Sequence, residues 1–420
     1  MKRMLPVVCF LAIVNSAFAE VPLTLDDCLS EAAENNPDLA ASRLAVQKAK
    51  YDYKASYSDM LPQVSANAGS SRSQSESSTD GSTSTRDSAS YGVSASQSLY
   101  TGGRNRAAVD QGSANLQAAE ADLGARRATL TYDVRKAFAG LLFAQDQIEL
   151  ARTILKRRQD NLDLIQLRYE GGRENKGALL LTQASARDAE YGVAQAERFL
   201  SVAQRQLARV LGRDDSELIR ISGKLEAGRA ATVADFEMLA ADTPTHRRAV
   251  AQFRAARAGL DSAKSQYFPE LSANASTGRS GEDWMPEQDE WFLGLSLSFP
   301  FFQGGKNVMN VRGAGAELQR VEANLRATDA ELVLILQQAL ADYADAIDRT
   351  EVQSAYLEAG EVRAEIARSQ YSSGMLSFED WDRIENDLIG SQKEYLAGRR
   401  DAILAEANWE KAQGKSLLPE

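Results

Sequence analysis

The chain has 420 residues, of which 48 are Lys or Arg and 59 are Asp or Glu, with two Cys and one His. Its hydrophobic content of 44% argues against disorder of the whole chain. Its formal net charge of −11 argues against nucleic acid or anionic lipid as the main partner.

The first 19 residues have the features of a secretory signal. Lys2 and Arg3 precede an apolar stretch from Met4 to Val14, and Ala17-Phe18-Ala19 supplies the small residues that a signal peptidase requires. The apolar stretch, about eleven residues long, is too short for a helix that spans a bilayer of about 30 Å. Removal of this segment, which contains Lys2, Arg3 and Cys9 but no acidic residue, takes the net charge from −11 to −13. It leaves Cys28 as the only cysteine, so we expect no internal disulfide.

The rest of the chain contains an internal duplication. The segment from Leu61 to Ala68 matches the segment from Phe268 to Ala275 at an offset of 207, with five identities in eight positions. The pair Gly102 and Gly103 matches Gly304 and Gly305 at an offset of 202. The five-residue difference falls in the Ser- and Thr-rich stretch 70–90, which tolerates insertion as a surface loop does. Each half is therefore predicted to run helix, hairpin, long helix, turn, helix.

Both halves contain the heptad pattern of a long coiled-coil helix. A repeat of 3.5 residues per turn makes packed helices supercoil left-handedly. A helix from Arg104 to Arg168 would be about 100 Å long at 1.5 Å per residue, and the helical stretches 24–60 and 175–211 would match it end to end. The heptad positions are Val109, Leu116, Leu123, Leu130, Ala137, Ala144 and Ala151 in the first half, and Leu318, Leu325, Leu332, Leu336, Tyr343 and Leu357 in the second.

The segments opposite the helical turns alternate in the way that two-faced strands do. Large apolar residues from Trp291 to Phe299 alternate with mainly small ones, which fits a transmembrane strand. Alternation alone favours a half-buried hairpin of a soluble domain, and the context reverses this preference. Aromatic residues near Phe268 and Phe302, and Trp284 and Trp291 towards the other end, favour two membrane interfaces. Four strands cannot close a barrel, whereas three chains would supply twelve. Ser70, Arg72 and Gln74 are poor residues for a bilayer midplane, which predicts that the first strand is short or that its loop begins early.

At the Pro-anchored strands, the Gly-Gly junctions and the duplicated long helices, the chain resembles the TolC-like outer-membrane efflux proteins over nearly its whole mature length. The resemblance implies a mainly α fold with a small β part, in which a long left-handed coiled-coil helical barrel joins a transmembrane β-barrel of four strands per chain. It implies a homotrimer in the outer-membrane lipid of a Gram-negative envelope, with a long periplasmic portion. The implied partners are a periplasmic adaptor and an inner-membrane transporter of the RND, ABC or MFS type, for efflux or type I secretion, and no cofactor is implied.

The resemblance also divides the chain into segments. The expected order is: 1–19 signal peptide, 20–62 first periplasmic helices, 63–102 first transmembrane hairpin, 103–212 long helix, turn and return helix, 213–236 equatorial segment, 237–268 first helix of the second repeat, 269–304 second transmembrane hairpin, and 305–420 second long helix, turn and return helix. Gly102, Gly103, Gly304 and Gly305 are the expected strand-to-helix junctions.

In the family, the helical turns at the periplasmic end meet the adaptor. The expected docking residues are Tyr169, Gly172 and Arg173 in the first turn, and Tyr371, Gly374, Met375 and Leu376 in the second. The first turn departs from the family pattern because Arg173-Glu174-Asn175 stands where short hydrophobic and hydroxyl residues are usual.

Relatives such as TolC close the tunnel entrance with paired acidic residues after the second turn. Asp380 lies six residues after Gly374, whereas Arg383 stands where a second aspartate is expected. Glu379 and Asp382 lie beside them, so we expect these four residues at the periplasmic aperture. An exposed acidic helix face with no such role is an equally good interpretation.

Two other classes of protein are weighed against the tunnel. An enzyme finds no support in one His, one mature Cys and no phosphate-binding Gly loop, and we expect His246 to be a plain surface residue of a helix. A soluble periplasmic coiled-coil adaptor or scaffold would need one helical hairpin between separate β-domains, whereas this chain has two equivalent hairpins of each kind.

Overall fold

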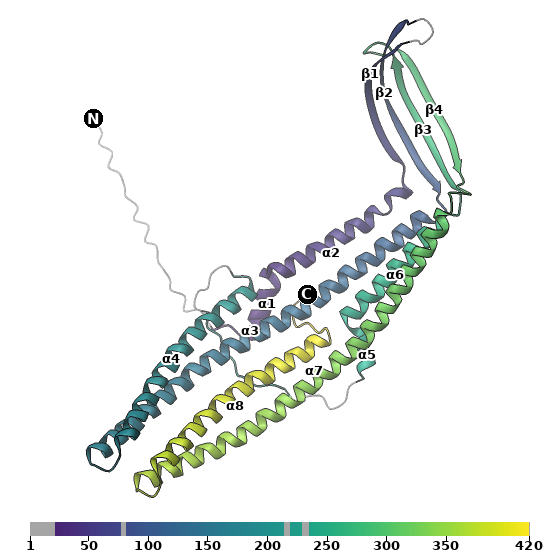
Figure 1. Ribbon diagram of the computed structural model, residues 1–420. Helices are drawn as coiled ribbons and strands as arrows, with labels where there is room; N and C mark the ends of the chain where they lie inside the picture. Colours follow the sequence, from purple (N-terminus) through teal and green to yellow (C-terminus); the bar gives the residue numbers. More distant parts are fainter. Residues whose placement is uncertain (1–21, 77–80, 214–218, 229–234, 420) are drawn as a thin grey trace, which may run out of the picture.

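The computed structural model describes residues 22–76, 81–213, 219–228 and 235–419. The expected secretory signal, residues 1–19, lies outside them. The described chain forms a long layer of helices with a four-stranded antiparallel sheet at one end (Figure 1). This mainly helical architecture with a small β part confirms the predicted fold class.

Two helices of 67 residues form the frame of the molecule. They are α3 (Arg104–Glu170) and α7 (Lys306–Ser372), and each is about 100 Å long at 1.5 Å per residue. The remaining helices are α1 (Leu25–Asn35), α2 (Pro37–Ala55), η1 (Ser58–Met60), α4 (Lys176–Leu211), α5 (Phe236–Asp242), α6 (Pro244–Ser265) and α8 (Phe378–Ala412).

The first helical stretch, expected over residues 24–60, is divided into two helices. Pro37 has no N–H to donate within a continuing helix, so α1 ends and α2 begins at this point. The Asn36 side chain caps α2 by accepting hydrogen bonds from the N–H groups of Asp38 and Leu39, each at 3.1 Å.

The helices form one layer with two open edges. Helix α3 packs against α2 and α4 and also against α6 and α8, whereas α7 packs against α6 and α8. Helices α2 and α4 lie along different halves of α3, so together they make one edge of the layer and α7 makes the other (Figure 1).

The largest apolar core lies midway along the helices. It joins α1, α3 and α4 to the described part of the equatorial segment through Ile219, Ile221 and Leu225. Leu23 forms a parallel bridge with Ile221. Cys28 is a free, fully buried thiol, and this burial raises its pKa to about 12.

The sheet consists of β1 (Gln63–Glu76), β2 (Thr83–Tyr100), β3 (Glu270–Gly281) and β4 (Gln288–Ser298) in that order. The expectation of a short first strand is wrong, because β1 pairs with β2 over 14 residues. A bidentate pair between Arg72 and Asp87 and a hydroxyl contact between Ser75 and Ser84 accompany this outer half of the ladder. Within the described residues, β1 and β4 each have one edge without a partner strand.

Glycine pairs form both strand-to-helix junctions. Gly102, Gly103, Gly304 and Gly305 all have positive φ angles, from 61° to 93°. At Gly102 a Cβ atom would also lie 2.7 Å from the Phe268 Cβ and from the Ser265 carbonyl oxygen. Only glycine fits this close left-handed turn, which redirects the chain from β2 into α3.

Across the described ranges, no helix combines the length and apolar character that crossing a membrane requires.

Candidate functional site

The two helical turns lie together at the end of the layer opposite the sheet (Figure 1). Their geometry is the same: Gly172 has φ of 68° and Gly374 has φ of 82°. The N–H of Arg173 donates to the Arg168 carbonyl at 2.8 Å, and the N–H of Met375 donates to the Gln370 carbonyl at 2.8 Å. These bonds satisfy carbonyl groups in the last turns of α3 and α7, so each turn caps the helix before it.

Contacts through Tyr371 join the two turns. Its phenolic oxygen donates to Glu174 Oε2 at 2.6 Å, and its carbonyl accepts from Arg168 Nη1 at 2.8 Å. Its ring stacks on Trp381 with 4.5 Å between centroids, and Phe378 packs edge-on against both rings. Burial and the neighbouring Glu174 carboxylate raise the pKa of Tyr371.

This burial changes the role expected for Tyr371. Only 1% of the residue is exposed, so its ring offers no surface to a partner, whereas Tyr169 is 38% and Met375 is 73% exposed. Leu376 is partly buried against the same aromatic cluster. Tyr371 is therefore a residue that holds the turns together rather than an exposed docking residue.

The unusual sequence of the first turn has a structural explanation. Glu174 is the acceptor for the Tyr371 hydroxyl, and Asn175 caps α4 by accepting from the Ala178 N–H at 2.9 Å. Sequence reasoning noted that these residues depart from the family pattern but missed their function. The departure from the family pattern was the sequence signal for these contacts, because it places two polar side chains where relatives usually have short ones.

The four predicted aperture residues do not lie on one face of α8. Asp380 and Arg383 form an ion pair at 2.9 Å, and Ser377 donates to Asp380 Oδ2 at 2.9 Å. Asp382 lies two residues after Asp380, which places it about 200° around the helix from Asp380, and it faces α3. Glu379 is exposed and has no ion pair within the described residues. Asp380 and Asp382 therefore lie on different sides of α8 and have different partners.

Asp382 belongs to a polar clamp between α3 and α8, which we define as Arg157, Arg158, Asp382, Glu385 and Asn386. Arg158 Nη1 lies 3.4 Å from Asp382 Oδ1, and Arg158 Nη2 donates to Asn386 Oδ1. Arg157 Nη1 lies 3.5 Å from Glu385 Oε2. Arg158 and Glu385 are both buried, so this clamp has few water contacts. Its sequence signal was the interruption of the heptad seam at Arg158.

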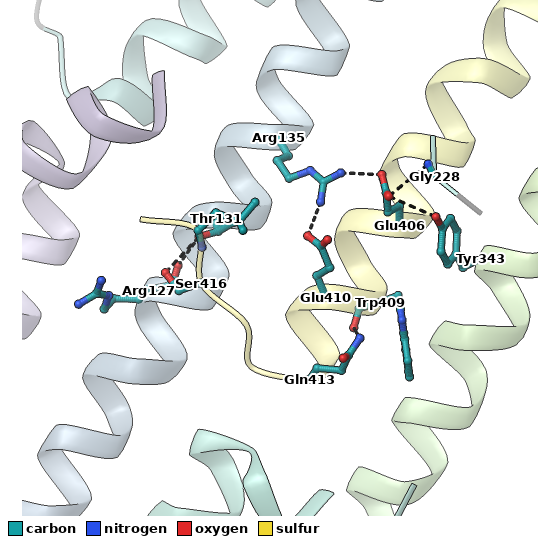
Figure 2. A network of polar contacts seen from close by, with 11 residues as sticks. Arg127, Thr131, Arg135, Gly228, Tyr343, Glu406, Trp409, Glu410, Gln413 and Ser416 are labelled. Atoms are coloured by element: carbon teal, nitrogen blue, oxygen red, sulfur yellow. Dashed lines mark hydrogen bonds and ion pairs between the residues drawn. The ribbon is translucent and has the colours of Figure 1, made fainter. Parts of the chain in front are cut away.

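A second polar network joins the two repeats at the middle of the layer (Figure 2). Arg135 of α3 donates to Glu406 at 2.7 Å and to Glu410, both on α8. Glu406 also accepts from the Tyr343 hydroxyl of α7 and from the Gly228 N–H, each at 3.2 Å. Burial, followed by the Glu406 charge, raises the pKa of Tyr343 to about 12.

The segment after α8 crosses α3 beside this network (Figure 2). The Leu417 N–H donates to Thr131 Oγ1 at 3.2 Å, and Arg127 donates to the Leu418 carbonyl at 2.9 Å. The Leu418 side chain is buried in the main apolar core. Helices α3, α7 and α8 and the equatorial segment are thus held in one arrangement.

The sheet has one apolar and one polar face. Because Thr277 pairs with Trp291 and Ala275 with Leu293, the apolar face of β4 continues across β3. On the opposite face, Ser65, Ser94 and Ser276 lie in one cross-strand row. Leu293, Leu295 and Leu297 are each at least 70% exposed, so within the described chain nothing covers the apolar face.

His246 is more engaged than expected. Its Nδ1 lies 2.7 Å from Asp329 Oδ1, and the side chain is half-buried between α6 and α7. In the part of the chain that the structure describes, no three His, Cys, Asp or Glu side chains meet in a way that could hold a metal ion.

A rod of long paired helices that continues into a sheet with an uncovered apolar face defines a channel protein of a cell envelope. The profile of the family described as outer membrane efflux protein matches residues 28–213 and 237–415. The chain belongs to this family, whose members are outer-membrane channels rather than enzymes.

Individual relatives agree with this assignment. The chain is 23% identical to the cation efflux system protein CusC of Escherichia coli O157:H7 over 388 residues, covering 88% of this chain and 81% of CusC. It is 25% identical to the alkaline protease secretion protein AprF of Pseudomonas aeruginosa over 285 residues, covering 66% of this chain and 58% of AprF. The solved structure of the outer-membrane channel OprN superposes with a TM-score of 0.85 at 20% identity, covering 94% of this chain and 91% of OprN.

Proposed function

We propose that three copies of this chain form a passive channel-tunnel that exports substrates across the periplasm and the outer membrane. It acts within a tripartite efflux pump or a type I secretion system, with a periplasmic adaptor and an inner-membrane transporter of the RND, ABC or MFS type. A water-filled tunnel performs no chemistry, so the energy for transport comes from the transporter.

The observation that carries this proposal is the pair of open edges. Strand β1 and helices α2 and α4 lie at one edge, whereas β4 and α7 lie at the other. Both edges expose large apolar side chains, namely Leu44, Tyr51, Leu180, Leu181 and Tyr191 on one, and Leu334, Val352, Tyr356, Val362 and Ile366 on the other. Head-to-tail contact between copies covers both edges and pairs β4 of one copy with β1 of the next.

The test is the mass of the mature protein extracted with detergent from outer membranes, measured by native mass spectrometry. We expect three copies per particle. The variant Tyr356→Glu, which places a charge on the exposed α7 edge, is expected to shift the population towards monomer, whereas Glu358→Gln on the same helix leaves it trimeric. A soluble monomer would instead support the periplasmic adaptor or scaffold alternative.

We propose that the aperture is lined by Glu379 and Asp380 with Arg383, and that Asp382 acts in the clamp instead. A ring of three Asp380 carboxylates in a narrow pore attracts multivalent cations, which then block the channel. This site lies at the first turn of α8, beside the second helical turn.

The expected effect of Asp380→Asn is weaker block by a trivalent cation such as hexamminecobalt. The concentration for half block in planar bilayers should rise at least about fivefold, equivalent to about 1 kcal/mol. Asp163→Asn on α3 removes an acidic residue from another helix of the same region and serves as the control. An unchanged half-block concentration in Asp380→Asn would contradict the aperture.

The exposed parts of the two turns are the proposed adaptor surface. They are Tyr169, Gly172 and Arg173 in one turn and Gly374 and Met375 in the other, with Leu376 partly buried beside them. The curated relatives are named for cations, an alkaline protease and solvents, so channels of this architecture serve very different cargo. We therefore assign substrate choice to the transporter rather than to this chain.

A further inference from the structure

Four charged residues interrupt the apolar face of the sheet at its outer end. Arg72 pairs across the strands with Asp87, and Arg279 pairs with Asp289. Successive side chains of a strand alternate between faces, so Arg279 and Asp289 lie on the same face as Trp291, Leu293 and Leu295. Ala68 pairs with Tyr91, which in turn pairs with Arg279, so Ala68 also lies on this face. Arg72 is four residues after Ala68 on β1 and therefore lies on the same face.

Their position along the sheet corresponds to a membrane interface. From Phe299 to Asp289 the chain covers ten residues, about 34 Å along a strand, or about 26 Å in height at a tilt of about 40°. This height matches the apolar band of about 25 Å in outer-membrane barrels. Tyr91 lies in the row of Arg279 and Asp289, and Trp291 lies two residues from Asp289 on the same face, as aromatic residues do at the edge of such a band.

The arginines are held in place and remain accessible. Arg72 donates from Nε and Nη2 to the two oxygens of Asp87, at 2.6 and 2.7 Å, yet its side chain is 74% exposed. Arg279 donates from Nε to Asp289 Oδ1 at 2.6 Å, its side chain also forms a hydrogen bond with Tyr91, and half of it is exposed. A guanidinium has five N–H donors, so these partners leave donors for a phosphate.

We propose that Arg72 and Arg279 bind the phosphate groups of a phosphorylated glycolipid in the outer leaflet of the membrane. The planar guanidinium matches phosphate geometry through paired N–H donors. Asp289 holds the Arg279 fork at the edge of the apolar band, and Asp87 holds the Arg72 fork four residues further out along the sheet. The contact is local, so it does not depend on the net charge of the chain, which is negative. This inference rests on the proposed function, because it requires the apolar face to lie in the outer membrane.

The test is lipid A titrated onto the detergent-solubilised trimer, with the bound lipid counted by native mass spectrometry. A basic residue near an anionic membrane surface strengthens binding by about 1 kcal/mol, or about fivefold. We therefore expect Arg72→Gln and Arg279→Gln each to weaken lipid A binding at least about fivefold. A lipid A analogue without its sugar phosphates should bind the wild type and both variants equally.

The chain supplies a matched control. Arg86 pairs with Ser73, the residue after Arg72 on β1. Because neighbouring residues of a strand alternate between faces, Arg86 lies on the face opposite Arg72. Arg86→Gln removes the same charge from the same hairpin and should leave lipid A binding unchanged. The double variant Arg72→Gln with Asp87→Asn should bind as weakly as Arg72→Gln, which excludes repulsion by an unpaired Asp87 as the cause.

The outcomes separate this inference from the proposed function. If the wild type and both arginine variants are trimers and bind lipid A with equal affinity, the lipid site is overturned but the proposed function is not. An equal loss in Arg86→Gln also overturns it, because the effect is then one of charge and not of position. A soluble monomer overturns the proposed function itself.

Discussion

Replacing Arg158 with Leu is expected to open the tunnel at its helical end. The Arg158 side chain is 8% exposed and holds both Asp382 and Asn386, so its loss leaves a largely buried carboxylate without its cation. Removing one partner of a buried pair costs about 3–5 kcal/mol, and about 2 kcal/mol is a fair value here because Asp382 is 21% exposed. We expect opening to loosen α8 from α3 at this end, which breaks the clamp in the open channel only. The ratio of open to closed channels in planar bilayers should therefore rise about 30-fold.

The control for this experiment is Arg152→Leu on the same helix. Arg152 is mostly exposed and pairs with Glu149 and Glu197 at the surface, where an ion pair contributes about 0–1 kcal/mol. Its conductance should match that of the wild type. A closed channel in Arg158→Leu, with a normal trimer mass, would show that the clamp does not hold the closed state.

The variant Arg135→Leu should destabilise the folded chain more than any exposed charge does. The Arg135 side chain is 11% exposed and lies between Glu406 and Glu410, so its removal leaves two neighbouring carboxylates without a cation. We expect a loss of about 3 kcal/mol in the free energy of unfolding. Denaturant unfolding of the purified protein, followed by circular dichroism, measures this change.

Arg320→Leu is the matched comparison for Arg135→Leu. Arg320 pairs with Glu317 within one turn of α7, and both side chains are at least half exposed. Such substitutions change stability by about 0.5 kcal/mol or less. Equal losses in the two variants would mean that the network in Figure 2 contributes no more than a surface pair.

Periodicity was sufficient to predict the frame of the molecule. A heptad repeat maintained over many turns predicts one long helix. The first long helix was expected from Arg104 to Arg168; it begins at Arg104 as expected and ends two residues later, at Glu170. The Gly-Gly junctions were equally predictable, since the left-handed turn between β2 and α3 excludes other residues.

The polar contacts between the repeats were not predictable from the sequence. Arg158 and Asn386 are 228 positions apart, and Glu174 and Tyr371 are 197 apart, so no local pattern connects them. A heptad pattern says which face of a helix is buried but not which helix lies against it. The separation of Asp380 from Asp382 required only helical geometry, but which of them meets α3 depended on the packing of α8.

The contrast between Tyr169 and Tyr371 has a consequence for the assembled ring. The two tyrosines occupy equivalent positions of the duplicated sequence, yet one is 38% exposed and the other is buried. The turns also differ in sequence, since Arg173-Glu174-Asn175 in the first stands where the second has Met375-Leu376-Ser377. An assembly of three copies therefore presents six turns of two alternating kinds, and its rim has threefold rather than sixfold symmetry. An adaptor that occupies all six positions must recognise two different surfaces, and one that recognises a single kind binds in three copies.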